Sequence, residues 1–261
     1  MLSCITAEEL AAALDAVAAE LLDTAGVDRP PVDALAVAEA IGLTVATDDE
    51  QHGRARYVRL RGLRGRTSRP TILLRPEPRP ERRHWAVAHE IGEHAAHRIF
   101  HRLGVDPRTV SPKAREGVAN QMAGRLLLPT AWFAGDAAAA DWDLLALKAR
   151  YPSASHELIA RRMLELVAPA IISIFDQERL SFRRSNVAGR APPPTRDEIA
   201  CWKAVHRRGR PHEIAQGMAR IRGWPVHEPG WKREILRTEV ACETTAWEGE
   251  APAEPFGDDE R

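Results

Sequence analysis

Cysteine is scarce in this sequence. Three cysteines occur among 261 residues, and no two of them stand in C-x-x-C spacing: Cys4, Cys201 and Cys242. The sequence therefore indicates neither a disulfide framework nor a zinc site built from thiolates. This cysteine usage favours a reducing, intracellular setting.

Net charge is also absent. The 37 Lys and Arg residues balance 37 Asp and Glu residues, whereas a protein that mainly holds nucleic acid usually has a clear basic excess. Basic and aromatic side chains do not interleave around Arg207-Arg208-Gly209-Arg210, so we interpret this run as a solvated turn. We expect no direct nucleic-acid binding.

Long hydrophobic runs are missing as well. No stretch approaches the roughly 18 to 20 apolar residues that a membrane span needs. The N-terminal segment carries four acidic residues where a signal peptide would be apolar: Glu8, Glu9, Asp15 and Glu20. We expect a cytoplasmic protein without a membrane association. Its hydrophobic fraction of 44% with 28% charged residues is that of an ordinary folded protein.

Apolar periodicity predicts a mixture of helices and short strands. Over residues 6–25, Thr6 followed by Glu9 forms a capping-box pattern in front of regularly spaced leucines. The longest helix is expected to begin near Pro80, because proline suits a first helical turn. Further helices are predicted at 33–41, 113–128, 142–150 and 155–166, and strand-like runs at 43–46, 55–60, 71–75, 171–175 and 180–183.

The composition changes after Asn186. Pro192-Pro193-Pro194 is typical of a linker, and the residues that follow hold several tryptophans in a polar background. The last residues are rich in acidic side chains and poor in aliphatic ones, which is typical of disorder. We predict a principal domain over 1–186, a Trp-containing C-terminal extension over 187–240, and an acidic, disordered tail over 241–261.

The string H-E-I-G-E-H at residues 89–94 is close to the H-E-x-x-H motif of zinc proteases. In that motif, histidines at positions i and i+4 lie about 40° apart around the helix and bind one metal. The glutamate between them acts as general base on the metal-bound water. Here Glu93 occupies the i+4 position from His89. A helix rich in Glu, His and Arg is often a solvated face, and we interpret His97 and His101 in that way.

Three arrangements of this string are open. In the first, His89 and Glu93 are metal ligands and Glu90 is the base, since a carboxylate also binds zinc. In the second, a local i→i+5 turn at Gly92 rotates His94 into line with His89. In the third, Glu90 and His94 form the ligand pair and Glu93 is the base, as in an inverted zinc motif.

A second segment, residues 113–128, offers a further acidic ligand. Glu116, Ala119, Asn120 and Ala123 share one face of the predicted helix. The small alanines allow this helix to approach the histidine-bearing helix closely, so that Glu116 can point at the same metal. A glutamate near a helix N-terminus is also favoured by the helix dipole alone.

Taken together, these segments resemble the ImmA/IrrE family of bacterial metallopeptidases, which are relatives of the zincins. The resemblance covers about residues 6–185, and the order and spacing of its segments are more specific than any one of them. The segments are the opening helix, Pro30-Pro31-Val32-Asp33 with Ala40-Ile41-Gly42, Thr71-Ile72-Leu73-Leu74, Arg82 to Gly92, Glu116 to Pro129, Ser153-Ala154-Ser155 with Arg161-Arg162-Met163, and Ile171 to Phe175.

The resemblance implies an α+β fold: a compact zincin-like domain with several helices around a small sheet, followed by a C-terminal extension. It implies a metal-dependent endopeptidase that acts on a cytoplasmic protein, with a helix-turn-helix transcriptional repressor as the expected substrate. Family members free genes for stress responses in this way. The alternative is a non-catalytic regulatory protein of the same fold that binds a repressor or another partner.

The resemblance also implies roles for single residues. His89 corresponds to the first metal ligand, Glu90 to the general base and Glu116 to the acidic third ligand. The second histidine of the family falls on Glu93, and His94 stays the rival ligand. The expected cofactor is a divalent metal, with zinc as the first choice. Oxygen-rich ligation leaves room for manganese or iron.

Overall fold

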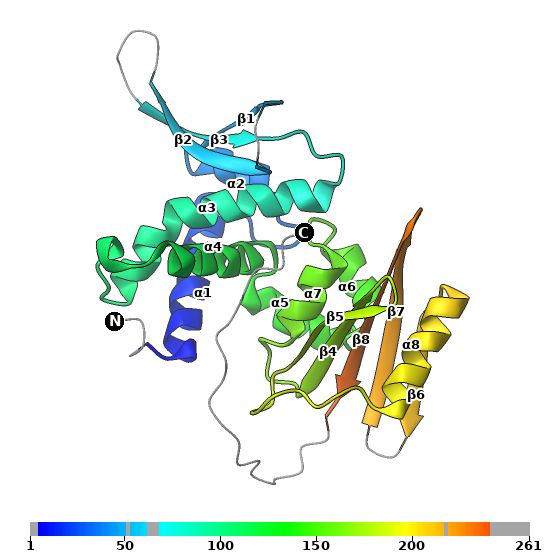
Figure 1. Ribbon diagram of the computed structural model, residues 1–261. Coiled ribbons are helices and arrows are strands. Elements are labelled where there is room, and N and C mark those ends of the chain that lie inside the picture. Colours follow the sequence, from blue (N-terminus) through cyan, green and yellow to red (C-terminus); the bar gives the residue numbers. More distant parts are fainter. Residues whose placement is uncertain (1–4, 51–52, 62–67, 217–218, 241–261) are drawn as a thin grey trace. The chain divides into compact units, whose positions relative to one another are not determined.

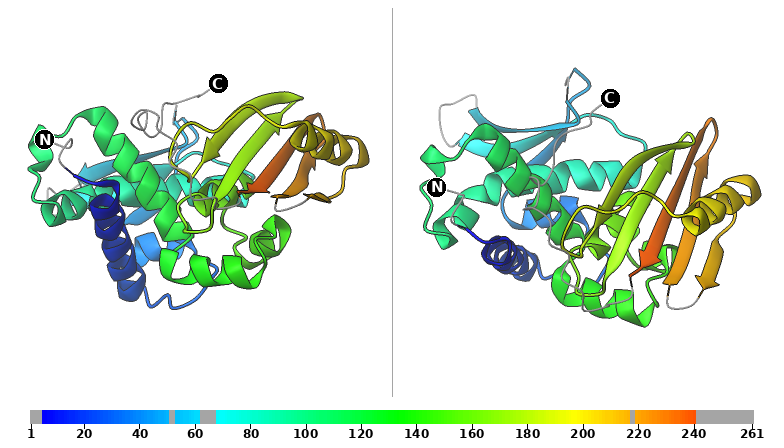
Figure 2. Two further views of the ribbon diagram at one scale, coloured as in Figure 1. Left: turned by 90° about the horizontal axis from the view of Figure 1, so that it is seen from below. Right: turned by 60° about the horizontal axis from the view of Figure 1, so that its bottom comes forward.

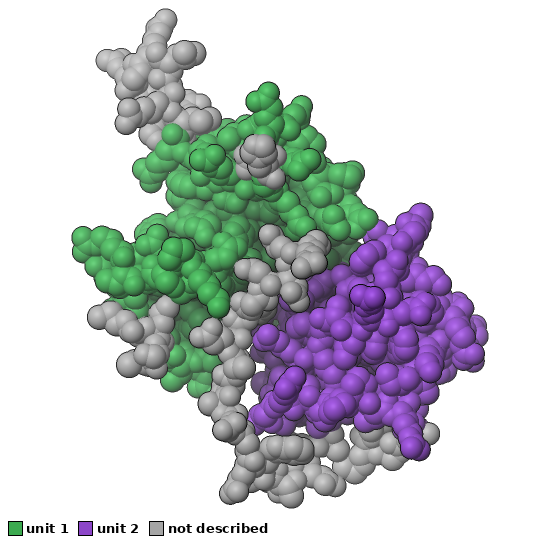
Figure 3. Space-filling model, in the orientation of Figure 1, with its two compact units in different colours: residues 1–140, 148–155 green, residues 141–147, 156–261 purple. Residues whose placement is uncertain are grey.

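The computed structural model describes residues 5–50, 53–61, 68–216 and 219–240. The predicted acidic tail, 241–261, lies outside the described residues. The chain divides into two compact units, which are shown in different colours in Figure 3. Unit 1 comprises residues 1–140 and 148–155, and unit 2 comprises residues 141–147 and 156–261.

The predicted α+β class is confirmed, because the described residues form eight α-helices and two sheets (Figure 1). Unit 1 begins with α1 (Ala7–Thr24) and α2 (Ala34–Ala40), followed by β1 (Thr44–Thr47), β2 (Ala55–Arg61) and β3 (Ser68–Leu74). It continues through α3 (Pro80–Arg102), a short 3-10 helix (Pro107–Thr109), α4 (Pro112–Leu127) and α5 (Thr130–Ala139). The helix α6 (Leu144–Arg150) contains one boundary between the units, because residues 141–147 belong to unit 2 and residues 148–155 to unit 1.

The predicted start of α1 is confirmed in detail. Thr6 is the N-cap, its side chain accepts from the Glu9 amide, and the Glu9 carboxylate accepts from the Thr6 amide. The reciprocal pair satisfies amide groups that the first helical turn leaves without partners. Leu14, Val17 and Leu21 then bury one stripe of the helix. Figure 2 shows α1 in dark blue from two further directions.

A three-stranded sheet with the order β1-β3-β2 lies beside α3. β1 runs parallel to β3, whereas β2 runs antiparallel to it. β2 is therefore an edge strand, and its outer row of backbone groups is not used by the sheet. β2 contacts α3, which makes those groups available to side chains of that helix.

The two long helices of unit 1, α3 and α4, pack against each other at very short range. A Cβ atom added to Gly92 would lie 2.7 Å from the Ala119 carbonyl oxygen and 3.2 Å from the Met122 Cβ. A side chain at this point of α3 would meet the backbone of α4, so glycine is the residue that fits here. The close approach predicted from the alanines of the second helix is confirmed.

Unit 2 is built on a five-stranded antiparallel sheet with the order β5-β4-β8-β7-β6. Its elements are α7 (His156–Met163), β4 (Ala170–Asp176), β5 (Arg179–Ser185), α8 (Arg196–Arg208), β6 (His212–Gln216), β7 (Ala219–Glu228) and β8 (Trp231–Glu239). The predicted hairpin is confirmed, with Gln177 and Glu178 at its turn. Both turn residues have positive φ, of 47° and 66°, as the tightest two-residue hairpin turns require.

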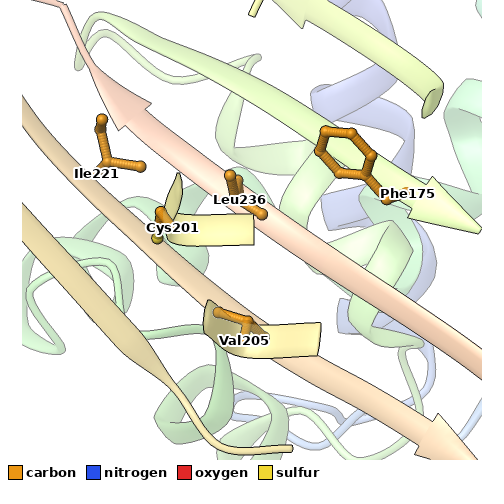
Figure 4. Packing of buried hydrophobic residues seen from close by; sticks show 5 residues of the cluster. All are labelled: Phe175, Cys201, Val205, Ile221 and Leu236. Atoms are coloured by element: carbon orange, nitrogen blue, oxygen red, sulfur yellow. The ribbon is translucent and has the colours of Figure 1, made fainter. Parts of the chain in front are cut away.

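One face of this sheet is covered by α8. Five buried side chains fill the space between the helix and the sheet (Figure 4): Phe175, Cys201, Val205, Ile221 and Leu236. A Cβ atom on Gly223 would lie 2.8 Å from a methyl carbon of Val205, so this glycine allows α8 to lie close to β7. This contact therefore sets the distance between α8 and the sheet.

Several of these elements were not predicted from the sequence: α5, α8 and the strands β6, β7 and β8. The strands before and after residue 186 belong to one sheet, since β4 pairs with both β5 and β8. Residues 187–240 thus complete the sheet that the hairpin of β4 and β5 begins. Within the described residues, no helix combines the length and the apolar character needed to cross a membrane.

The contact at Gly92 generates the first prediction. Gly92→Ala places a methyl group against the backbone of α4, and overpacking of this kind costs about 1–3 kcal/mol. Gly117→Ala is the matched control, because the same methyl group on α4 meets nothing within 4 Å. Helix propensity favours alanine equally at both positions. Urea unfolding followed by circular dichroism should rank Gly92→Ala below Gly117→Ala by about that amount. Equal midpoints would contradict the close packing.

The N-terminus of α8 generates the second prediction. Glu198 is buried and accepts bonds from the Arg183 guanidinium at 3.0 and 2.9 Å and from the Thr238 hydroxyl at 2.6 Å. Burial acts to raise the pKa of Glu198, but these bonds outweigh it and hold the pKa below its ordinary value of 4.5. Its contribution to stability is therefore present above pH 4.5 and is lost as the pH falls through the lower folded value.

Glu198→Gln should lower the free energy of unfolding at pH 7 by about 3 kcal/mol, because it leaves the buried Arg183 without its counter-charge. The difference from the unmodified protein should shrink as the pH falls below 4.5. Urea unfolding at a series of pH values, followed by tryptophan fluorescence, measures both effects. Asp197→Asn, one residue earlier on α8, is the control and should keep the pH dependence of the unmodified protein. A difference that is constant with pH would count against this role of Glu198.

Candidate metal centre

The middle of α3 and the first half of α4 bring three potential metal ligands together. One ligand atom each from His89, Glu93 and Glu116 lies within 4.8 Å of the others. The His89 Nε2 atom lies 3.5 Å from the Glu116 Oε1 atom. His89 and Glu93 are one helical turn apart on α3, so both face α4 where Glu116 stands. His89 and Glu93 are half-buried, and Glu116 is exposed.

Asn120 fixes the orientation of this group. Its Oδ1 atom lies 3.0 Å from the Nδ1 atom of His89, and its Nδ2 group donates to Glu116 Oε1 at 3.3 Å. An amide oxygen only accepts, so Nδ1 of His89 carries a proton, and Nε2 is the ring nitrogen that faces Glu116. Partners of this kind orient metal-binding histidines and fix their tautomer. Nε2 is therefore the ring nitrogen of His89 that is placed to bind a metal.

Glu90 lies beside the cluster but is held differently. Its carboxylate is buried, and Oε2 accepts the backbone N–H of Tyr57, on the edge strand β2, at 2.6 Å. Burial raises the pKa of Glu90 above its ordinary value, and the carboxylates of Glu93 and Glu116 add to the rise. The charge of His89 and the Tyr57 amide act in the opposite direction without cancelling it. Glu90 thus holds a proton more readily than an exposed glutamate.

His94 faces a different partner. Its Nδ1 atom lies 3.3 Å from the Tyr57 hydroxyl, and the two rings are 5.4 Å apart. α3 continues as an α-helix through Gly92, so the i→i+5 turn considered for this position is not formed. Burial lowers the pKa of His94, and His97, Arg59 and Arg98 add to this effect. His94 therefore loses its proton more readily than an exposed histidine, and it is not among the three clustered ligands.

Two further histidines of α3 lie on its surface. His97 and His101 are exposed, as expected for a solvated face. They line an open concavity of about 940 Å³ near the C-terminal end of α3, together with Arg98 and Arg102. None of the five predicted site residues lines it. The chemistry-bearing cluster and this concavity are separate features of unit 1.

The clustered side chains fit a divalent cation. One imidazole and two carboxylates supply nitrogen and oxygen donors of the types that zinc, manganese and iron accept. Their separations allow one ion to contact all three after small side-chain rotations. The two carboxylates together carry the charge that a divalent ion balances. The cluster is also open to solvent at Glu116, so an ion and water can enter.

Two residues near the cluster were not assigned a role from the sequence. Asn120 stands one helical turn after Glu116, so the spacing itself places the two side chains together. This signal was available and was not used. Tyr57 contributes a backbone amide to Glu90 and a hydroxyl to His94 from a strand more than 30 residues earlier. No local pattern in the sequence indicates these two contacts.

Comparisons with known proteins agree with this architecture. Residues 38–164 match the peptidase M78 family, described as the IrrE N-terminal-like domain. Among solved structures, a Mycobacterium tuberculosis transcriptional regulator has a similar fold, with a TM-score of 0.63 and 18% sequence identity. The similarity covers 86% of this chain and 74% of that chain. At this identity the likeness describes the fold alone. No curated protein matches the chain.

Proposed function

Because residues 38–164 match the IrrE N-terminal-like domain of the peptidase M78 family, we propose that this chain is a metal-dependent endopeptidase that acts on a cytoplasmic protein. The family match supports a metal-dependent, protease-like fold. The proposal goes further, to an active site in unit 1 and to a protein substrate. The observation that carries it is the convergence of His89, Glu93 and Glu116 within 4.8 Å, next to Glu90.

In the proposed site, His89, Glu93 and Glu116 hold a divalent cation. Bound there, the cation supplies Lewis-acid activation of water and of the peptide carbonyl group. Asn120 keeps the Nε2 lone pair of His89 directed at the ion, as its 3.0 Å contact to Nδ1 indicates. Glu116 approaches from the second helix and closes the ligand set.

Glu90 is the proposed general base. Its Oε2 atom is occupied by the Tyr57 amide, which leaves Oε1 to take a proton from the attacking water. A base works best when its pKa lies near the working pH, and burial moves the pKa of Glu90 in that direction. The same carboxyl group can return the proton to the leaving amine. Its fixed position on α3 keeps it beside the ligands throughout.

Glu93 at the second ligand position changes the chemistry of the site. Two carboxylates and one imidazole place two negative charges on a divalent ion, which weakens it as a Lewis acid. The oxygen-rich set also relaxes the preference for zinc and admits manganese or iron. We assign the second position to Glu93 rather than His94, because His94 contacts Tyr57 in place of the cluster.

The proposed substrate is a helix-turn-helix transcriptional repressor. This part of the proposal rests on the resemblance to the ImmA/IrrE family, and the similar fold of a transcriptional regulator is compatible with it. Cleavage of a repressor would couple the chain to transcription regulation and to stress responses. An alternative of a different class is a non-catalytic regulator that binds the repressor without cutting it. The carboxylate at position 93, where the family has histidine, favours this alternative.

Metal binding is the first test of the proposed site. His89→Ala combined with Glu116→Gln should remove one equivalent of bound metal per chain, since two of the three ligands are lost. Equilibrium dialysis against Zn²⁺ or Mn²⁺, followed by elemental analysis, gives the stoichiometry. Asn120→Ala, which removes only the supporting bond to His89, should weaken binding about 10- to 100-fold. His101→Ala, an exposed position on the same helix, is the control and should bind as the unmodified protein does. Unchanged stoichiometry in the double variant would reject the site.

Proteolysis is the second test, and Glu90→Gln is the variant that decides it. The amide has nearly the shape of the carboxylate but cannot accept the proton, so cleavage should fall by at least 10²-fold while metal stays bound. New protein N-termini can be counted by mass spectrometry in cells that express either form. The termini that depend on the unmodified chain should include one within a helix-turn-helix protein. The same set of termini in both cultures, with transcription still regulated, would establish the non-catalytic alternative instead.

A further inference from the structure

Unit 2 contains a second group of potential metal ligands: His206 on α8, His227 on β7 and Glu234 on β8. One ligand atom from each lies within 4.8 Å of the others. We propose that these three side chains form a second divalent-metal site, with two imidazole nitrogens and one carboxylate oxygen as ligands. The group lies outside the family match at residues 38–164, so it stands independently of the proposed peptidase.

The strand register explains why these residues meet. His227 pairs with Lys232 and Pro225 pairs with Glu234, so His227 and Glu234 are diagonal neighbours on one face of the sheet. α8 covers that face, and His206 stands in its last turn. Gly223 allows the helix to lie close, so the imidazole of His206 reaches the strands. The three ligands thus come from three elements whose spacing the core determines.

The distances single out one oxygen atom. Glu234 Oε1 lies 3.0 Å from His206 Nδ1 and 2.6 Å from His227 Nε2. The other oxygen, Oε2, accepts the indole N–H of Trp202 at 3.0 Å. Trp202 itself stacks on Phe175, so the indole that holds this oxygen is itself fixed by packing. One oxygen is fixed by the fold and the other is directed at two ring nitrogens.

The charge balance at Glu234 is unusual. Its carboxylate is fully buried, and within the described part of the chain it forms ion pairs with His206 and His227 alone. No arginine or lysine of these residues compensates it. A buried carboxylate without a permanently charged partner is costly, and a cation bound beside it would offset that cost.

The ring of His206 stands between two carboxylates. Nδ1 lies 3.0 Å from Glu234, and Nε2 lies 3.5 Å from Glu178, a residue of the β4–β5 turn. With Nε2 directed at Glu178, Nδ1 is the ring nitrogen that lies beside Glu234 and is placed to bind a metal there. Carboxylates that accept the outer N–H of a metal-binding histidine are a common supporting feature of metal sites.

The donor set determines which cations fit. Two imidazoles and one carboxylate suit zinc, and also iron or manganese when further positions remain open to water. Ligands of one tetrahedral zinc ion stand about 3.3 Å apart, as bond lengths of about 2.0–2.1 Å require. The two imidazoles would therefore move away from Glu234 by less than about 1 Å. Both rings are partly exposed, at 19% and 22%, so they can move and water can reach the ion.

The experiment uses the full chain with the first cluster removed, His89→Ala and Glu116→Gln, so that the two sites are counted separately. Equilibrium dialysis against Zn²⁺ and elemental analysis should give one equivalent per chain in this background. Adding His227→Gln should abolish it, whereas adding His212→Gln, a half-buried histidine of β6, should leave it unchanged. Glu178→Gln should weaken binding about 10- to 100-fold without changing the stoichiometry.

A second readout covers variants that fold poorly. Co²⁺ replaces Zn²⁺ and absorbs visible light according to its ligands, so the spectrum of the background chain should change with His227→Gln and not with His212→Gln. No metal in the background chain, or an identical stoichiometry and spectrum after His227→Gln, would overturn the second site. Neither result bears on the peptidase, whose test is the equivalent lost with His89 and Glu116.

Discussion

The contact between Gly92 and Ala119 is the constraint on which unit 1 depends. It brings α3 and α4 closer than any larger side chain would allow. The ligand atoms of His89, Glu93 and Glu116 converge across this close helix pair, within 4.8 Å of one another. The same approach lets Asn120 of α4 reach His89 of α3. Because Gly92 has no side chain at the helix contact, the polar side chains of the two helices can lie close together beside it.

The elements of unit 1 could be predicted where local chemistry specifies them. The capping box of Thr6 and Glu9 and the helix that begins at Pro80 are local patterns, and the structure confirms both. The closeness of the two long helices followed from small residues on one face. The contacts of Tyr57 could not be predicted, because they depend on how the edge strand β2 lies on α3. The metal-binding roles of the clustered residues stay predictions.

Unit 2 was harder to predict because its strands break the usual patterns. Proline is normally confined to sheet edges, yet Pro225 lies in β7, which has neighbours on both sides. The register explains the exception, since β6 pairs only with residues 219–223 of β7. At Pro225, β7 has no partner on the β6 side, so no backbone amide donor is needed there. Buried charged residues such as Arg222 and Glu234 also interrupt the apolar alternation by which a strand is recognised.

Two buried carboxylates, one on α8 and one on the strand β8 that it covers, are compensated in different ways. Glu198, near the start of the helix, is compensated by the permanently charged guanidinium of Arg183. Glu234, near its end, has two imidazoles as its ion-pair partners, and imidazole nitrogens can also bind a metal ion. The first arrangement is fixed at every pH near neutrality, and the second is exchangeable. In the proposed sites, the ligands of unit 1 neutralise a divalent ion fully, whereas those of unit 2 leave one positive charge. An ion bound in unit 2 would therefore be the stronger Lewis acid of the two, and its nitrogen-rich ligands would favour zinc over manganese.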